Sequence, residues 1–131
     1  MIGLDTNVLV RYIMQDDPKQ SPKATKLIGA LTVAAPGFVP LVSMVELAWV
    51  LSSCYGLTRD QVVQTLELML RTKEIVIDSA DLVLKALRIF KASNADFADC
   101  LIERSASSAG CTDTMTFDVN AAKTAGMTLV L

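Results

Sequence analysis

The sequence predicts an α/β fold: a mostly parallel central sheet of four or five strands, flanked by helices on both faces. Short apolar segments alternate with longer segments of helical periodicity along the whole chain. That alternation favours parallel strands joined by right-handed crossovers. The 131 residues contain no internal repeat and no linker-like stretch, and their number suits one folded core. We therefore expect a single domain over residues 1–131.

The composition excludes several classes of protein. Hydrophobic residues make up 52% and charged residues 20%, which is typical of a folded chain. No apolar run reaches the roughly 18–20 residues of a membrane span, and no basic leader precedes the first strand, so we expect a cytoplasmic protein without a membrane partner. Because the net charge is −2, a polyanion would need a local basic patch or bound cations.

The chain has no histidine, which excludes Ser-His-Asp and Cys-His catalysis and histidine-dependent zinc sites. Cys54, Cys100 and Cys111 show no CxxC spacing, so neither a disulfide framework nor a zinc site is indicated. We expect all three to be buried as small hydrophobic residues. Acid–base chemistry would have to use carboxylates, lysine, tyrosine or metal-bound water.

The first strand is expected at the start of the chain and ends in Asp5-Thr6-Asn7, where a helix begins. In an open α/β sheet, ligands bind at such junctions. Asp5 could instead simply cap the helix, and for a lone aspartate that interpretation is preferable. Because the chain has further acids at comparable junctions, we favour a ligand-binding site over capping alone for Asp5.

Proline-, glycine- and polar-rich turns divide the rest of the chain. We expect a loop over 15–22, a helix over 24–31, a bent or edge strand over 38–42, and an apolar helix over 44–53 capped by Ser43. A helix with a capping box follows from Thr58 and forms a hairpin with its predecessor. Further expected elements are a strand over 74–78, helices after Ser79 and Asn94, a strand over 111–117, a short helix over 121–124 and a last strand over 127–131.

Glu46 is the only charged residue between Lys26 and Arg59. An ionised acid is costly to bury alone, so it must reach solvent, a cation or a hydrogen-bond donor. It could merely face water near the start of its helix, where the helix dipole favours it. We favour a functional role.

Asp96, Asp99 and Glu103 are spaced i, i+3, i+7 and share one helical face. The helix dipole alone would explain Asp96 and Asp99, and Glu103 could simply pair with Arg104 or Lys91. Asp118 ends its strand as Asp5 ends the first, with Thr116 projecting to the same side.

In the predicted sheet, the carboxyl ends of the strands share one edge, where several of these acids would gather. Four or five carboxylates cannot all stay ionised there unless something neutralises them. Mg²⁺ and Mn²⁺ prefer such oxygen ligands. A bound ion could activate a water molecule against a phosphodiester, and a second ion about 4 Å away could stabilise the leaving oxygen.

Four motifs follow one another over essentially the whole chain: Leu4-Asp5-Thr6-Asn7-Val8-Leu9, then Glu46 within residues 42–47, then residues 96–102, and finally Thr116-Phe117-Asp118. In these motifs the chain resembles a PIN domain, and in particular VapC-type toxins of bacterial toxin–antitoxin pairs. One such motif is weak evidence, whereas four in this order and at these separations are specific.

The resemblance implies a PIN-like fold and a Mg²⁺- or Mn²⁺-dependent endoribonuclease with Asp5, Glu46, Asp99 and Asp118 as catalytic acids. Asp5, Asp99 and Asp118 would hold the metal together with Asp96, which matches an extra acid of many relatives. Asp99 is aligned to the core position because it directly precedes Cys100-Leu101-Ile102, although the two aspartates could be exchanged. The polar positions around the acids are matched by Thr6, Asn7, Ser43 and Thr116, and Arg11 is a candidate RNA contact.

The resemblance further implies an RNA substrate, often a structured RNA such as tRNA, a homodimer, and a VapB-like antitoxin that places a basic side chain among the acids. Two alternatives stay open. A phosphotransfer or phosphatase-type α/β domain is disfavoured because Asn7 stands where a DxD motif needs its second acid. A non-catalytic PIN-like RNA-binding module is disfavoured by the complete set of acids.

Overall fold

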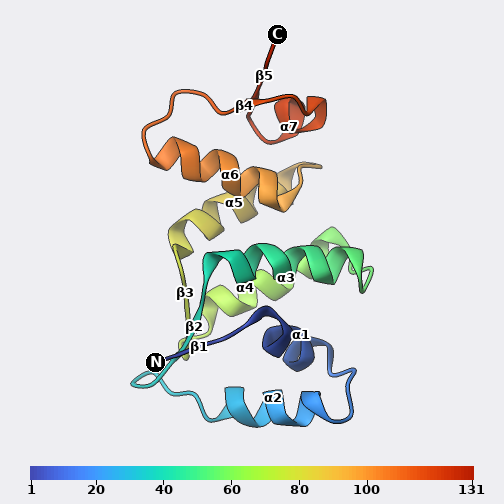
Figure 1. Ribbon diagram of the computed structural model, residues 1–131, viewed down its shortest axis with the longest axis vertical. Helices are drawn as coiled ribbons and strands as arrows, with labels where there is room; N and C mark the ends of the chain where they lie inside the picture. Colours follow the sequence, from blue (N-terminus) through green and yellow to red (C-terminus); the bar gives the residue numbers. More distant parts are fainter. The chain divides into compact units, whose positions relative to one another are not determined.

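The computed structural model describes all residues 1–131 and contains seven helices and five short strands (Figure 1). All strand pairs are parallel, so the predicted α/β class is confirmed. The elements in chain order are β1 (Ile2–Gly3), α1 (Thr6–Met14), α2 (Gln20–Gly29), β2 (Gly37–Val39), α3 (Leu41–Ser53), α4 (Arg59–Arg71), β3 (Ile75–Ile77), α5 (Ala80–Ala92), α6 (Phe97–Ser108), β4 (Met115–Thr116), α7 (Val119–Thr124) and β5 (Thr128–Leu129). No helix combines the length and the apolar character that crossing a membrane requires.

The chain forms two compact units, Met1–Asp78 and Ser79–Leu131. They are called unit 1 and unit 2 below, and each is described by itself. Unit 1 holds β1–β3 and α1–α4, and unit 2 holds the remaining elements. The expectation of a single domain over residues 1–131 stays a prediction.

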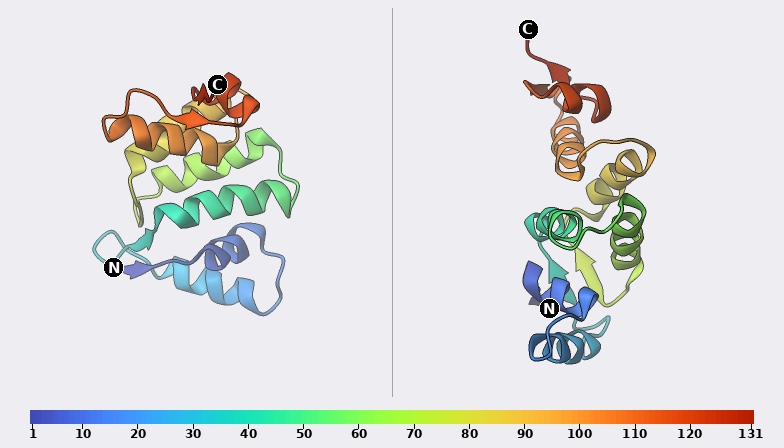
Figure 2. Two further views of the ribbon diagram at one scale, coloured as in Figure 1. Left: turned by 45° about the horizontal axis from the view of Figure 1, so that its top comes forward. Right: turned by 90° about the vertical axis from the view of Figure 1, so that its right-hand side faces the viewer.

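In unit 1 the strands form a three-stranded parallel sheet in the order β1-β2-β3 (Figure 2). Ile2 is in register with Gly37, and Val39 with Ile77. Leu4 continues the ladder, because its N–H donates to the Phe38 carbonyl at 2.8 Å. A Cβ on Gly37 would lie 2.7 Å from Leu4 Cδ1, so glycine is what allows this leucine to pack against β2.

Apolar stripes of the helices close the core of unit 1. Its largest fully buried side chains are Leu4, Leu9, Val39, Met44, Leu47, Leu51, Val62 and Leu66. Helix α4 begins with the predicted capping box: Thr58 Oγ1 accepts the Gln61 N–H at 3.2 Å, and Gln61 Oε1 accepts the Thr58 N–H at 2.9 Å. This local pattern places the start of α4 as expected.

The prediction that Ser43 caps the apolar helix is wrong. That helix, α3, begins at Leu41 after Pro40, and Ser43 lies inside its first turn and is buried. Pro40 has no side-chain acceptor; instead, Asp78 Oδ2 accepts the Leu41 N–H at 3.3 Å. An acid at the end of β3 therefore helps to begin α3. The strand expected over 38–42 correspondingly ends at Val39.

Other boundaries also differ from the predictions. Helix α2 begins at Gln20 rather than Ala24, because Asp17 Oδ1 accepts the backbone N–H groups of Lys19 and Gln20. The strands expected over 111–117 and 127–131 shorten to two residues each. Cys100 is buried as predicted, but Cys54 and Cys111 are exposed: Cys54 lies in the turn after α3, and Cys111 follows the turn after α6.

Unit 2 pairs β4 with β5 in parallel, with Met115 opposite Thr128. Helices α5 and α6 pack along each other, and Phe90 meets Phe97 edge to face with ring centroids 5.8 Å apart. The buried face of α5 consists of Val83, Ala86, Leu87 and Phe90.

Candidate active site

In unit 1, the first predicted acid and Glu46 line one pocket of about 460 Å³, called the acidic pocket below. Residues from β1–α1, α3 and the turn after α3 line it: Asp5, Thr6, Asn7, Val10, Arg11, Glu46, Val50, Cys54 and Tyr55. The fold thus brings together five residues singled out from the sequence, namely Asp5, Thr6, Asn7, Arg11 and Glu46.

Asp5 stands between β1 and α1 and caps the helix, so the structural role considered for it is real. Its Oδ1 accepts the Thr6 N–H at 2.7 Å. The backbone therefore orients the carboxylate, while Oδ2 has no protein donor. Capping and a ligand role are compatible because they use different oxygens.

Glu46 lies in the second turn of α3, on its exposed side. The hydroxyl of the buried Thr6 donates to Glu46 Oε1 at 3.0 Å. The sequence indicated that this isolated acid needs solvent or a donor, and it has both. Its second oxygen, Oε2, has no protein donor and is open to a ligand.

Asn7 and Ser43 differ in their placement. Asn7 is exposed at the pocket wall, in the first turn of α1. Ser43 is buried in α3, three residues before Glu46, and does not line the pocket. Ser43 could therefore influence the acids only indirectly, by helping to position α3.

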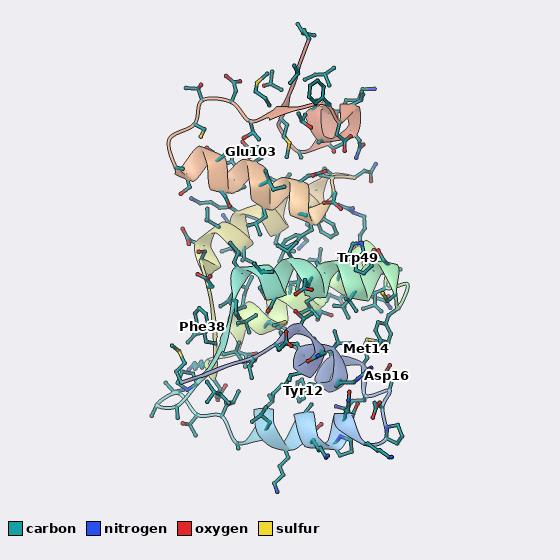
Figure 3. All side chains as sticks on the ribbon, viewed as in Figure 1. Tyr12, Met14, Asp16, Phe38, Trp49 and Glu103 are labelled. Carbon is teal, nitrogen blue, oxygen red and sulfur yellow. The ribbon has the colours of Figure 1, made fainter.

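Arg11 belongs to a network that the local sequence does not predict. Its Nη1 donates to Asp16 Oδ1 and to Tyr55 Oη, both at 3.3 Å, and its Nε donates to Gln20 Oε1 at 2.8 Å. The Tyr55 hydroxyl donates to Asp16 Oδ2 at 2.6 Å. Figure 3 shows Asp16 in the loop that follows α1. The network fixes that loop against α2 and the end of α3.

The Tyr55–Asp16 hydrogen bond changes the acidity of both partners. It lowers the pKa of the Asp16 carboxyl, with the nearby Arg11 acting in the same direction. It also raises the pKa of the Tyr55 phenol, because the carboxylate stabilises the bound proton. No sequence pattern pairs these residues, which stand 39 positions apart.

The acids of unit 2 also occupy helix starts. Asp96 caps α6, with its Oδ1 accepting the Asp99 N–H at 3.0 Å. Asp118 caps α7 through the N–H groups of Asn120 and Ala121. Thr116 Oγ1 accepts the Asp118 N–H at 3.0 Å, so this threonine fixes the backbone of the acid, as its position on the same side of the strand suggested.

The pKa of the Asp99 carboxyl is raised, first by partial burial and then by the negative charges of Asp96 and Asp118. Asp96 and Asp118 thus both lie within electrostatic reach of Asp99. Asp99 is the half-buried one, whereas Asp96 and Asp118 are exposed.

Glu103 does not join this group of acids. Arg104 binds it with two hydrogen bonds, Nε to Oε2 at 2.6 Å and Nη2 to Oε1 at 2.8 Å (Figure 3 labels Glu103 on α6). The expected simple pairing with Arg104 is confirmed.

The predicted site residues thus fall into two groups. Unit 1 contributes Asp5, Thr6, Asn7, Arg11, Ser43 and Glu46, and unit 2 contributes Asp96, Asp99, Thr116 and Asp118. No group of three or more acidic or cysteine side chains that could hold a metal ion is formed in either unit.

A family model described as "PIN domain" matches residues 2–127 of the chain. No curated protein matches it. Members of the matching family are generally metal-dependent nucleases, which places the activity of the chain, in coarse terms, among hydrolases acting on nucleic acid.

Proposed function

The chain belongs to the PIN domain family, and on this premise we propose that it is a Mg²⁺- or Mn²⁺-dependent endoribonuclease. The proposal includes its role as a VapC-type toxin that hydrolyses phosphodiester bonds in structured RNA such as tRNA. The observation that carries it is the acidic pocket, where Asp5 and Glu46 each keep one carboxylate oxygen without a protein donor.

The residues proposed to hold the ion are Asp5, Asp99 and Asp118, with Glu46 as the fourth catalytic acid and Asp96 as an accessory ligand. All are oxygen donors of the kind that Mg²⁺ and Mn²⁺ prefer. The raised pKa of the Asp99 carboxyl supports the fit: partial burial raises it most, and the negative charges of Asp96 and Asp118, which a cation would offset, raise it further. When bound, the ion would supply an activated water and charge stabilisation at the leaving oxygen.

Of the two aspartates at the start of α6, Asp96 and Asp99, we propose Asp99 as the principal metal ligand. Asp96 uses Oδ1 as the helix cap, towards the Asp99 N–H. The Asp99 side chain accepts no such capping bond and is partly buried. A partly desolvated carboxylate is attracted more strongly to a cation than an exposed one.

The chain's own residues orient these acids. Thr6 holds one oxygen of Glu46, which leaves the other free to accept a hydrogen bond from water or from the substrate. The backbone of α1 holds Asp5, and Thr116 holds the backbone of Asp118. Such support limits reorganisation when charge develops during hydrolysis.

We propose that the partners are a VapB-like antitoxin and a second copy of the chain, in the cytoplasm. Support for the antitoxin comes from an apolar groove of about 670 Å³ in unit 1. Side chains from α1, α2, α4 and β3 line it: Leu9, Tyr12, Ile13, Gln15, Thr25, Ile28, Thr65, Leu68, Met69, Thr72 and Ile75. An antitoxin segment lying there could extend an arginine to the acids, which accept its guanidinium in place of the ion.

The test is incubation of the purified chain with total RNA in Mg²⁺ or Mn²⁺, compared with chelator and with Asp5→Asn. Asp60→Asn is the matched control, since it removes an exposed acid from the start of α4. We expect the wild type and Asp60→Asn to cut, and the chelated and Asp5→Asn samples to be inactive. RNA binding without cutting would support the binding-module alternative, and phosphate incorporation from a small phosphodonor would support the phosphotransfer alternative.

A further inference from the structure

A second hollow of about 270 Å³ adjoins the acidic pocket within unit 1. It is called the side hollow below, and it is lined by Asn7, Val8, Arg11, Gln20, Lys23, Ala24 and Leu27. Asn7 and Arg11 line both hollows. A ligand in the acidic pocket could therefore continue past Arg11 into the side hollow.

The α2 wall of the side hollow is basic. Gln20, Lys23, Ala24 and Leu27 recur at i, i+3, i+4 and i+7, so they form one face of the helix. Helix α2 contains no acidic residue, and Lys23 makes no ion pair. In a chain with a net charge of −2, this is a local positive surface beside an acidic pocket.

Arg11 stands between the two hollows in a fixed orientation. Its Nε and Nη1 are used by Gln20, Asp16 and Tyr55, whereas Nη2 has no protein acceptor. The Arg11 side chain is 32% exposed. A guanidinium held by two nitrogens, with the third free, is a pre-organised donor for an anionic oxygen.

We infer that the side hollow binds a phosphate of the RNA backbone next to the scissile one, with Arg11 and Lys23 as its ligands. This inference rests on the proposed nuclease function and adds a substrate subsite to it. It also explains how an acidic chain holds a polyanion outside its acidic pocket: two cations contact the backbone where the strand leaves the carboxylates.

The side hollow is suited to a phosphate rather than a base. No aromatic side chain lines it, and single-stranded bases are usually recognised by stacking on aromatic rings. A lysine, an arginine and two amide side chains provide charge and hydrogen bonds, which position a strand without reading its sequence. Loss of the subsite should therefore weaken the binding of all RNA sequences to the same extent.

Lys23→Gln is the main test, because this exposed side chain has no hydrogen bond or ion pair whose loss would disturb the fold. Lys73→Gln is the matched control: it removes the same charge from an exposed position in the loop before β3, outside both hollows. Both changes are placed in the Asp5→Asn chain, and binding of a fluorescent single-stranded RNA oligonucleotide is measured over a range of salt concentrations.

We expect Lys23→Gln to weaken binding and to reduce the slope of log K against log salt by about 0.7, the value for one lost phosphate contact on a single strand. Lys73→Gln should leave the slope unchanged. In the chain with Asp5 intact, Lys23→Gln should raise KM for RNA cutting with little change in kcat. Two oligonucleotides of different sequence should be affected equally.

Equal slopes for Lys23→Gln and Lys73→Gln, while the wild type cuts RNA, would overturn the subsite and leave the nuclease function standing. If the loss of affinity in Lys23→Gln depended on the sequence of the oligonucleotide, the assignment of the subsite to a phosphate would be overturned. Failure of the wild type to cut RNA in either Mg²⁺ or Mn²⁺ would instead overturn the proposed function, and the subsite inference with it.

Discussion

The Thr6 hydroxyl donates a hydrogen bond to Glu46 Oε1 at 3.0 Å across 40 positions of sequence. It joins the first turn of α1 to α3, and Thr6 directly follows Asp5. One buried threonine thus links the two acids that line the acidic pocket. Thr6 acts through Glu46 and is therefore a positioning residue.

We expect Thr6→Val to lower kcat for RNA cutting by about 10–100-fold, the usual effect of removing an outer-shell partner at a metal site. Valine has nearly the same shape but cannot donate, so Glu46 loses its only protein donor. Thr6→Ser, which keeps the hydroxyl, should retain most activity. Steady-state kinetics on one RNA substrate provide the measurement, with melting temperatures as the control for folding. Equal kcat values for the valine and serine variants would contradict the positioning role.

We expect Mn²⁺ to raise the melting temperature of the wild type. At 100 times its dissociation constant, a ligand that binds only the folded chain stabilises it by about 2.7 kcal/mol. Asp118→Asn should lose most of this gain, yet melt like the wild type in chelator, because asparagine caps a helix as well as aspartate does. Thermal unfolding in chelator and in rising Mn²⁺ measures both effects. An undiminished gain in Asp118→Asn would remove this residue from the ligand set.

The raised pKa of the Asp99 carboxyl predicts a pH-dependent effect on stability. The folded chain favours protonated Asp99, so this stabilisation is complete below the ordinary pKa of 3.8 and is lost as the pH rises through the raised folded value. Asp99→Asn should therefore be more stable than the wild type at pH 7 in chelator, because asparagine carries no charge that burial, Asp96 and Asp118 would disfavour. The gain should vanish below pH 3.8. Urea unfolding at several pH values measures the difference in the free energy of unfolding between the two chains. A difference that does not change with pH would contradict an origin in the charge of Asp99.

The Tyr55 hydroxyl is expected to govern the acidity of Asp16. In Tyr55→Phe, the pKa of the Asp16 carboxyl should rise towards its ordinary value of 3.8, because the 2.6 Å hydrogen bond that lowers it most is removed. The stability that Asp16 contributes is present above pH 3.8 and is lost as the pH falls through its lowered pKa. NMR titration of the Asp16 carboxyl carbon reads the shift directly. An unchanged titration would assign the lowering to the backbone hydrogen bond of Asp16 and to Arg11 instead.

Features fixed by neighbouring residues could be predicted from the sequence. The Thr58–Gln61 capping box follows from a four-residue pattern. Asp5 follows a short apolar segment and precedes a helical stripe, so its place at a strand–helix junction could be read directly. The isolation of Glu46 indicated that it needs solvent, a cation or a hydrogen-bond donor, although it did not identify Thr6.

Features fixed by distant residues could not be predicted. Ser43 looked like a cap because it precedes an apolar run, but Pro40 and the distant Asp78 begin that helix three residues earlier. The Tyr55–Asp16 bond likewise depends on the tertiary packing of α3 against the loop after α1. A single sequence contains no signal for such pairings, because each partner alone looks like an ordinary surface residue.

The contact between Asp78 and the Leu41 N–H has a consequence for the order of folding. Helix α3 carries Glu46, yet the residue that completes its beginning arrives 37 positions later, at the end of β3. During synthesis, Glu46 can emerge and become helical before its helix is anchored. A nascent chain that stops before Asp78 therefore lacks the hydrogen bond that begins the helix carrying Glu46.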